Sequence, residues 1–212
     1  MIALRLARPW LVVDLGRPMR VLGWALNSPG FATASRLAWR EVRNADLPED
    51  LDAGRWLAGA LAATGLADAP CLLTSSDIGR HLHRSATVDG VTAEAVATVG
   101  LTNAERIGHR RAPVAAFGTI NVAVVLDAPL SDGAMVEALS LVAEARTAAV
   151  LAQGPALPSG PATGTGTDCI LLACPAGAMP HAGKHTAVGE AVGRCVLESV
   201  AEGVAAWMAN PP

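Results

Sequence analysis

Short apolar runs alternate with turn residues over the first forty residues of the chain. The turn signals are Arg8-Pro9, Gly16-Arg17-Pro18 and an Asn-Ser-Pro-Gly stretch at 27–30. Proline fixes φ and glycine readily reaches positive φ, so such clusters mark places where a strand ends or turns. The runs between them predict strands that pair as hairpins or as an antiparallel meander. The four predicted strands are Ile2–Leu6, Trp10–Leu15, Val21–Leu26 and Leu37–Val42.

After residue 46 the apolar positions follow a helical period. Leu51, Gly54, Leu57, Ala58 and Leu61 recur at helical spacing, and Asp50 precedes them as a candidate N-cap. Small or apolar residues three to four positions apart line one face of a helix. We therefore predict a helix over Leu47–Leu66 with Asp50 as its cap.

An Asp89-Gly90 pair separates two β-type runs, Ser85–Val88 and Val91–Leu101. Asp-Gly is a favoured sequence for two-residue hairpin turns because both turn residues take positive φ. We predict a hairpin at this point.

The second half of the chain alternates between strand and helix patterns. An apolar, β-branched run over Gly118–Asp127 predicts a strand, and a helical period follows from Ser131 or Asp132, either of which can cap it, to Leu151. Cys169–Cys174 is a fully apolar strand pattern, and Thr186–Met208 is again helical. With the strand-rich N-terminal half, this predicts an α/β fold with an α+β-like mixed sheet, as a single compact domain over residues 1–212. The order of the strands stays open.

The composition excludes several function classes. Hydrophobic residues make up 51% of the 212 residues, charged residues 17%, and the formal net charge is −3. Such a chain lacks the basic field that attracts nucleic acid, and no uninterrupted apolar run reaches the ~20 residues of a spanning helix. Arg5 and Arg8 interrupt the segment that a signal peptide would keep apolar. We expect a soluble cytoplasmic protein with no nucleic-acid or membrane partner.

The four cysteines include no C-x-x-C pair. In a chain of this size we expect buried thiols rather than a disulfide framework or a zinc site. Cys169 follows a polar loop directly, but its place at the start of an apolar strand favours a structural thiol over a nucleophile.

Uncharged polar and glycine residues gather in four segments, each next to a predicted strand or helix: 102–104, 118–121, 161–168 and 181–186. The third carries Thr163, Thr165, Thr167 and Asp168 with glycines between the threonines. Such a loop can turn backbone N–H groups toward a ligand or an oxyanion. A tight connection into a buried strand explains it equally well. It matches neither the P-loop spacing nor G-x-G-x-x-G.

The fourth segment contains His181 and His185. Their spacing of four would place both on one helical face, but Pro180 and Gly183 indicate that the helix begins only near Thr186. We therefore expect no metal site. A histidine at a helix entrance can act as a general acid or base, because imidazole titrates near neutrality. Glu190 either orients it or interacts with the helix dipole.

Taken together, these segments resemble the adenosylcobinamide amidohydrolase family of corrinoid salvage. The similarity runs from about Leu22 to Leu197. The residues that carry it are Leu26-Asn27, 98–104 (TVGLTNA), 118–121 (GTIN), 130–134 (LSDGA) with Glu137-Ala138, 144–149 (EARTAA), 162–168 (ATGTGTD), and 183–186 (GKHT) with Gly189-Glu190.

The resemblance implies hydrolysis of the amide that joins the aminopropanol arm to the corrin ring, giving adenosylcobyric acid. A corrinoid substrate is the expected small-molecule partner, no metal or other cofactor is indicated, and oligomerisation is left open. A large, amide-fringed ligand suits an apolar pocket with an uncharged polar rim. Trp24 and Trp39 are candidates for stacking on it.

Amide hydrolysis needs a base, donors for the oxyanion and a proton for the leaving amine. Our hypothesis makes Asp168 or His185 the base and His185 or Lys184 the acid, with Glu190 as a further catalytic candidate. The backbone of Thr165–Thr167 and Asn121 would supply oxyanion donors. The expected substrate-binding residues are Asn27, Asn103, Asn121, Ser131, Asp132, Thr163, Thr165 and Thr167.

Two other interpretations remain. Thr165 or Thr167 could become an N-terminal nucleophile after self-cleavage. Alternatively, the same pocket could belong to a corrinoid carrier without catalytic activity. The charged residues Asp168, Lys184, His185 and Glu190 favour catalysis, since a carrier needs only neutral amide contacts.

Overall fold

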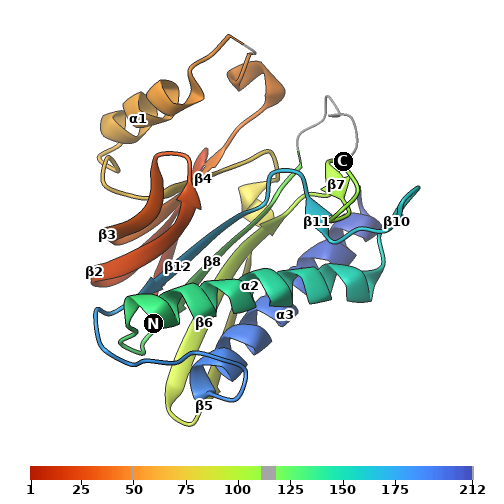
Figure 1. Ribbon diagram of the computed structural model, residues 1–212. Helices are drawn as coiled ribbons and strands as arrows, with labels where there is room; N and C mark the ends of the chain where they lie inside the picture. The colour runs from red at the N-terminus through yellow and green to blue at the C-terminus, as the bar shows by residue number, and fades with distance from the viewer. Residues whose placement is uncertain (49, 111–117, 212) are drawn as a thin grey trace.

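The N-terminal apolar runs form a hairpin of two long strands. In the computed structural model, which describes residues 1–48, 50–110 and 118–211, strand β2 (Trp10–Ala25) pairs antiparallel with β3 (Ser28–Glu41) (Figure 1). The two strands predicted between residues 10 and 26 are thus one strand. Its register shifts between Asp14 and Met19, where Gly16 has a φ of 71°. The glycine–proline signal therefore bends this strand instead of ending it.

The main sheet is mixed and has eight strands among the described residues. Strand β1 (Ala3–Ala7) pairs antiparallel with β2, which confirms the predicted antiparallel start. The remaining order is β4 (Cys71–Thr74), β3, β2, β12 (Cys169–Cys174), β8 (Ile120–Leu126), β6 (Val91–Val99) and β5 (Leu82–Val88). The β12–β8 and β3–β4 pairs are parallel, and the other pairs are antiparallel. The predicted α/β class is confirmed, whereas β4 was not predicted.

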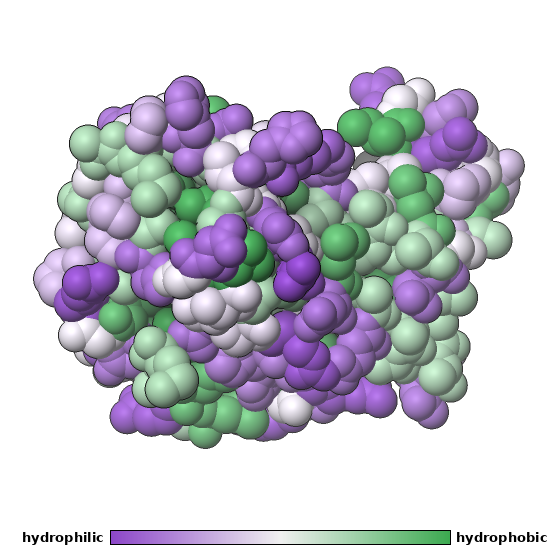
Figure 2. All heavy atoms as spheres, turned by 90° about the horizontal axis from the view of Figure 1, so that it is seen from below, coloured by the Kyte–Doolittle hydropathy of each residue, from purple (hydrophilic) through white to green (hydrophobic). Residues whose placement is uncertain are grey.

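Two long helices cover one face of the sheet (Figure 1). The side chain of Ser131 caps α2 (Asp132–Gln153) by accepting from the N–H of Ala134, and Thr186 caps α3 (Ala187–Ala209) in the same way through Gly189. Both predicted helices are confirmed to within two residues. Among the described residues, no helix has both the length and the apolar character needed to span a bilayer. Figure 2 shows hydrophilic and hydrophobic residues interspersed over the face seen from below.

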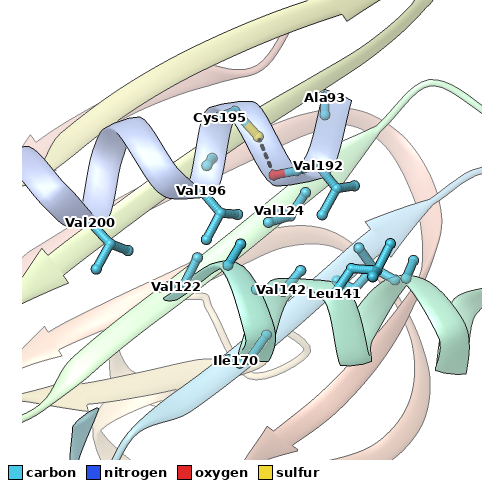
Figure 3. Packing of buried hydrophobic residues seen from close by; sticks show 14 of the residues in the cluster. Ala93, Val122, Val124, Leu141, Val142, Ile170, Val192, Cys195, Val196 and Val200 are labelled. Carbon is cyan, nitrogen blue, oxygen red and sulfur yellow. Dashed lines mark hydrogen bonds between the residues drawn. The ribbon is translucent and has the colours of Figure 1, made fainter. Parts of the chain in front are cut away.

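Small aliphatic side chains fill the layer between helices and sheet. Val192, Val196 and Val200 of α3 face Val122 and Val124 of β8 in this cluster (Figure 3). Alanine and valine project little from the backbone, so helices and strands approach closely and pack at high density. The alanine-rich composition thus serves the core.

On the opposite face the sheet bends over itself. Leu11, Leu37 and Trp39 from the hairpin share one buried cluster with Val96 of β6 and Ala123 of β8. Strand β2 contacts β12 only through residues 20–23, so its first half is available to fold across this face. The bend at residues 14–19 therefore closes the second half of the core.

The first helix is shorter than predicted. Helix α1 spans Ala53–Ala63, and its cap is Asp52, whose carboxylate accepts from the N–H of Arg55. The prediction of a helix over Leu47–Leu66 capped by Asp50 is wrong in its bounds and its cap. Leu57 and Leu61 nevertheless form the buried face, against the outer part of β2 and β3.

Short strands in the polar loops position the functional segments. Strand β11 (Gly164–Thr165) pairs with β7 (Ala104–Glu105), so two of the four polar segments lie side by side. The helix-to-strand connection also holds a small hairpin of β9 (Ala156–Leu157) and β10 (Gly160–Pro161). None of these two-residue strands was predicted, because they lack an apolar pattern.

The contact between β2 and β12 gives the first prediction. A Cβ at Gly23 would collide with the backbone oxygen of Ile170, whereas one at Gly59 of α1 meets nothing within 4 Å. We expect Gly23→Ala to lower the free energy of unfolding by about 1–3 kcal/mol, as overpacking does. Gly59→Ala should raise it by about 0.5–1 kcal/mol, because alanine favours a helix. Urea unfolding of both variants tests this, and a tolerated Gly23→Ala would contradict the close strand contact.

Candidate functional site

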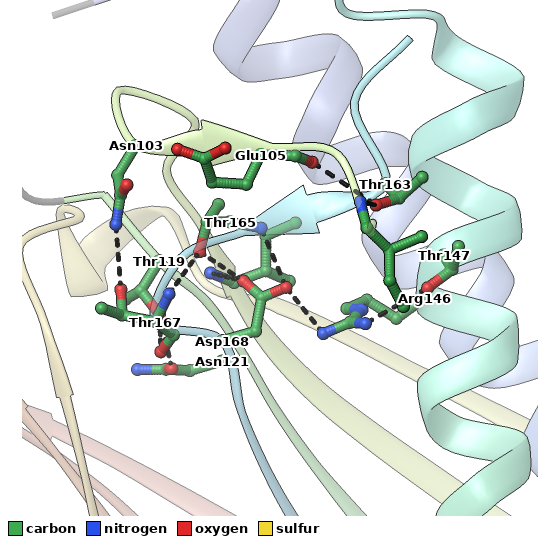
Figure 4. Close-up of polar contacts among 12 residues, drawn as sticks. Asn103, Glu105, Thr119, Asn121, Arg146, Thr147, Thr163, Thr165, Thr167 and Asp168 are labelled. Carbon is green, nitrogen blue, oxygen red and sulfur yellow. Dashed lines mark hydrogen bonds and ion pairs between the residues drawn. The ribbon is translucent and has the colours of Figure 1, made fainter. Parts of the chain in front are cut away.

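The carboxylate of Asp168 organises its own loop, residues 161–168, which we call the Gly-Thr loop (Figure 4). Oδ1 accepts from the N–H of Ile120 at 3.0 Å and from Oγ1 of Thr165 at 2.5 Å. Oδ2 accepts from the N–H of Thr165 at 3.0 Å and from the guanidinium of Arg146 at 2.6 Å. The side chain is only 7% exposed. Four donors match the lone-pair positions of an ionised carboxylate, so Asp168 holds its own loop, β8 and α2 together.

A second network ties the loop to the start of β8. Oγ1 of Thr119 lies 3.0 Å from Oδ1 of Asn121 and 2.9 Å from the carbonyl oxygen of Thr167. Oγ1 of Thr167 donates to the carbonyl of Gly118 at 3.1 Å, and the amide of Asn103 lies 3.4 Å from it. Three of the four predicted polar segments therefore meet here, although they are far apart in the sequence.

The backbone N–H groups expected to face a ligand already have partners inside this network. The N–H of Thr165 donates to Asp168, that of Gly166 to the carbonyl of Asn103, and that of Thr167 to Oγ1 of Thr165. Asn121 is fully buried and donates to the carbonyl of Leu73 at 2.6 Å. These donors are therefore hydrogen-bonded within the chain in this structure, and their role as oxyanion donors stays a prediction.

Glycine is needed where this loop approaches its neighbours. A Cβ at Gly164 would collide with the carboxylate of Asp168, and one at Gly118 with Oγ1 of Thr102. The absence of a side chain at Gly164 lets the loop close around the carboxylate, and at Gly118 it lets the backbone approach Thr102 and Asn103.

A large cavity opens on one side of the loop, with a volume of about 570 Å³. Trp24 stands at its wall, 45% exposed, and its indole N–H donates to the carbonyl of Asp168 at 2.9 Å. Trp39 is fully buried, so the expectation that it stacks on a ligand is wrong. The lining residues are Trp24, Leu26, Val42, Arg43, Leu47, Cys71, Leu72, Leu73, Thr74, Ser75, Gly118, Thr119, Gly166, Thr167, Asp168 and Cys169. Most of these side chains are apolar, with hydroxyls at one edge.

A smaller and more polar cavity of about 290 Å³ lies on the other side of the same loop. It is lined by Glu105, Arg106, Ile107, Arg146, Thr147, Thr163, Gly164, Thr165, Gly166 and Asp168. Gly166 and Asp168 line both cavities. The loop is thus a shared wall.

The predicted candidates at the start of α3 lie elsewhere. Lys184 pairs with Glu144 of α2 at 2.5 Å, and Glu190 pairs with Arg194 within its own helix. His185 is exposed in the turn before α3. None of these three residues lines either of the two cavities. The structure therefore does not bring them together with Asp168.

Three of the predicted binding residues, Asn27, Ser131 and Asp132, line neither of the two cavities and bind other parts of the chain. The amide of Asn27 bridges the carbonyl of Ala69 and the N–H of Cys71, both at 2.9 Å. Ser131 caps α2, and Asp132 pairs with Arg20. Thr163 accepts from the N–H of Ile107 at 2.8 Å and, with Thr165, lines the smaller cavity.

Three arginines line the cavities and were not predicted as site residues from the sequence. Arg146 and Arg106 line the smaller cavity and Arg43 the larger one. Arg146 lies within the 144–149 segment that carries the family resemblance, which was the available signal. Among the described residues, no group of three His, Cys, Asp or Glu side chains is placed to hold a metal ion.

The cysteines are free thiols, and three of the four are buried. Burial raises the pKa of Cys71, Cys169 and Cys195 to about 12 and raises the pKa of Cys174 as well. A thiol that stays protonated at neutral pH is a poor nucleophile. The expectation of buried thiols is confirmed, with Cys169 half-buried in the larger cavity.

Comparison with known proteins agrees with the resemblance in the sequence. Residues 2–212 match the family model described as adenosylcobinamide amidohydrolase. A curated protein named adenosylcobinamide amidohydrolase from Halobacterium salinarum is 33% identical over 155 residues, covering 66% of this chain and 62% of that protein. An uncharacterized protein of Methanocaldococcus jannaschii is 36% identical over 94 residues, covering 42% of this chain and 37% of that protein. The chain thus spans less than two thirds of the length of these relatives.

The buried ion pair of Arg146 and Asp168 gives the second prediction. Its side chains are 15% and 7% exposed, whereas those of Arg194 and Glu190 are 57% and 45% exposed. Removing one partner of a buried pair costs about 3–5 kcal/mol, and an exposed pair contributes about 0.2–1 kcal/mol. We expect Arg146→Met to lower the free energy of unfolding by the larger amount and Arg194→Met to change it little. Equal effects in urea unfolding would contradict a central role for this pair.

The raised thiol pKa values give the third prediction. At pH 8 the native thiols should react slowly with iodoacetamide and rapidly once unfolded in urea. Above pH 9, the ordinary thiol pKa here, unfolded thiols ionise while folded ones stay protonated. The free energy of unfolding should therefore fall as the pH rises from about 9 toward 12. Fast alkylation of native Cys169, identified by peptide mass, would show that its thiolate is accessible.

Proposed function

This chain belongs to the adenosylcobinamide amidohydrolase family, and from that membership we propose that it hydrolyses the amide joining the aminopropanol arm to the corrin ring of adenosylcobinamide. The products would be adenosylcobyric acid and 1-aminopropan-2-ol. The observation that carries the proposal is the match to the family model over residues 2–212. The loops of both cavities fall within it.

The larger cavity suits an apolar ligand with neutral polar groups at its edge. Trp24, Leu26 and Leu72 offer apolar surface, and Thr74 and Thr119 lie along the same lining. A cavity of about 570 Å³ is in the usual range for small-molecule sites. In our proposal it binds part of a corrinoid, whose apolar body carries neutral amides around its rim. Trp24 is placed to contact a flat conjugated ring.

The pair of Thr165 and Asp168 is the best-placed group for proton transfer. The hydroxyl of Thr165 lies 2.5 Å from the carboxylate, and Arg146 holds the other carboxylate oxygen. A hydroxyl next to an oriented base is the arrangement that acyl-transfer sites use. In our proposal a water attacks the amide carbonyl and passes its proton through Thr165 to Asp168. The same pair then returns the proton to the leaving nitrogen.

In this assignment His185 and Lys184, which were predicted to be catalytic, take no part in the reaction because they lie outside the two cavities. The contact of Lys184 with Glu144 of α2 and the exposure of both residues support a role on the surface, in the turn before α3. His185→Ala therefore serves as a comparison in the experiment below.

The alternative of a non-catalytic corrinoid carrier shares the larger cavity and differs in the smaller one. A carrier needs no hydroxyl–carboxylate pair, and the short contact between Thr165 and Asp168 favours catalysis. The self-cleavage alternative uses the same Thr165 and predicts two fragments by intact-mass measurement.

The fourth prediction concerns turnover. Incubation with adenosylcobinamide should release adenosylcobyric acid, detected by chromatography and mass, and EDTA should leave the rate unchanged. Thr165→Val should lower kcat by about 100-fold or more, in the range of general acid–base contributions, while Thr165→Ser retains most activity. Exposed Thr87 supplies the control variant Thr87→Val, and His185→Ala should leave kcat within about threefold.

Binding of adenosylcobinamide without any product would contradict the proposal and favour a carrier. Wild-type turnover by a folded Thr165→Val variant would refute the proton-transfer assignment. A loss of activity in His185→Ala comparable with that in Thr165→Val would return the catalytic role to the turn before α3.

A further inference from the structure

Two unlike cavities share one wall. The larger lies between the β2–β3 hairpin and the Gly-Thr loop, and the smaller between that loop and α2. Gly166 and Asp168 belong to both linings. A ligand that crosses the edge of this wall would place one part on each side, with its connecting bond beside the carboxylate.

The smaller cavity carries charges of both signs. Arg146 donates to Asp168 and to the hydroxyl of Thr147 at 3.2 Å. Arg106 donates to the carbonyl of Ser159 and lies over Gly160, where a Cβ would collide with its guanidinium. Glu105, an acidic residue whose backbone carbonyl accepts from Thr163, also belongs to this lining. The hydroxyls of Thr147, Thr163 and Thr165 complete it.

We infer that this smaller cavity receives the aminopropanol arm of the substrate, while the corrin side of the amide remains in the larger one. The inference rests on the proposed function and adds to it the place where the leaving group binds. The arm is short and carries one hydroxyl, which the threonine hydroxyls can hydrogen-bond. At about 290 Å³ the cavity suits a small polar group better than a corrin body.

The charges fit what hydrolysis produces. The substrate amide is neutral and takes up one water, its carbon–nitrogen bond breaks, and a new carbon–oxygen bond forms. One product is a carboxylate, and the other is an amine that takes the proton and becomes an ammonium. Glu105 faces the ammonium with a carboxylate, which has about four lone-pair positions and can accept it beside the contact it already makes. Arg146, at the shared wall, faces the new carboxylate with a guanidinium.

The opposite arrangement, with the aminopropanol arm in the larger cavity, fits the lining residues less well. Among the described residues, the lining of the larger cavity includes Trp24, four leucines and a valine, and Arg43 is its one cationic side chain. An ammonium there would lose water, and the one carboxylate of this described lining, that of Asp168, already has four donors. The polar arm therefore belongs with Glu105.

Product inhibition tests this assignment and is the fifth prediction. The probes are 1-aminopropan-2-ol and adenosylcobyric acid, each added to adenosylcobinamide hydrolysis by the wild-type protein. Glu105→Gln should raise the inhibition constant of 1-aminopropan-2-ol about tenfold, as expected for the loss of one charge-assisted hydrogen bond. It should leave that of adenosylcobyric acid within about twofold. Trp24→Ala should instead raise the inhibition constant of adenosylcobyric acid and leave that of 1-aminopropan-2-ol within about twofold. Glu198→Gln, on the exposed side of α3, is the matched control and should change neither constant.

The outcomes separate the two proposals. If the wild-type protein releases no product, the proposed function fails. If it turns over but Glu105→Gln leaves inhibition by 1-aminopropan-2-ol unchanged, the leaving-group assignment alone fails. Weakening of that inhibition by Trp24→Ala would place the arm in the larger cavity and would likewise overturn the assignment.

Discussion

The buried ion pair between Arg146 and Asp168 is the interaction on which the site depends. One carboxylate receives donors from α2, from the start of β8 and from its own loop. A buried carboxylate is costly unless its charge is compensated, so the four donors and the loop conformation require one another. Without this contact, the loop would lose the hydrogen bonds that hold it between the two cavities.

The core determines where that ion pair can form. Alanine and valine side chains allow α2 and α3 to lie close to β8 and β12 (Figure 3). At that separation Arg146 reaches across from the middle of α2 to the loop before β12 (Figure 4). Because the chain carries few charged residues, few ionic groups are buried among the described residues, and those at the Gly-Thr loop have specific partners.

Periodicity was enough to predict the elements with strong apolar patterns. Both long helices, the Asp89-Gly90 hairpin and β12 were found because their patterns extend over many residues, and the turn adopts the positive φ values that Asp-Gly suggests. Strand β4 and the two-residue strands were missed because they are short and depend on distant partners. The bend in β2 was read as a strand end because proline and glycine give the same local signal for both.

For the site, local sequence identified the loop but not its role. Asp168 was singled out, and two of its four donors belong to nearby Thr165, yet the other two come from residues 22 and 48 positions away that local sequence does not connect with it. Lys184 and His185 were grouped with it because the sequence does not show which loops share a cavity. Asn121 looked like a donor for a ligand, whereas it is buried in a strand and bonds to Leu73.

The fold thus combines an apolar cavity, a polar cavity and a carboxylate–hydroxyl pair at their common wall. The most direct measurement of this account is hydrolysis of adenosylcobinamide by Asp168→Asn, with substrate affinity and thermal unfolding measured on the same protein. The account predicts a variant that is less stable than wild type, because Arg146 loses its charged partner, and that turns over at least about 100-fold more slowly when measured below its unfolding temperature. Wild-type turnover by the folded variant would contradict it.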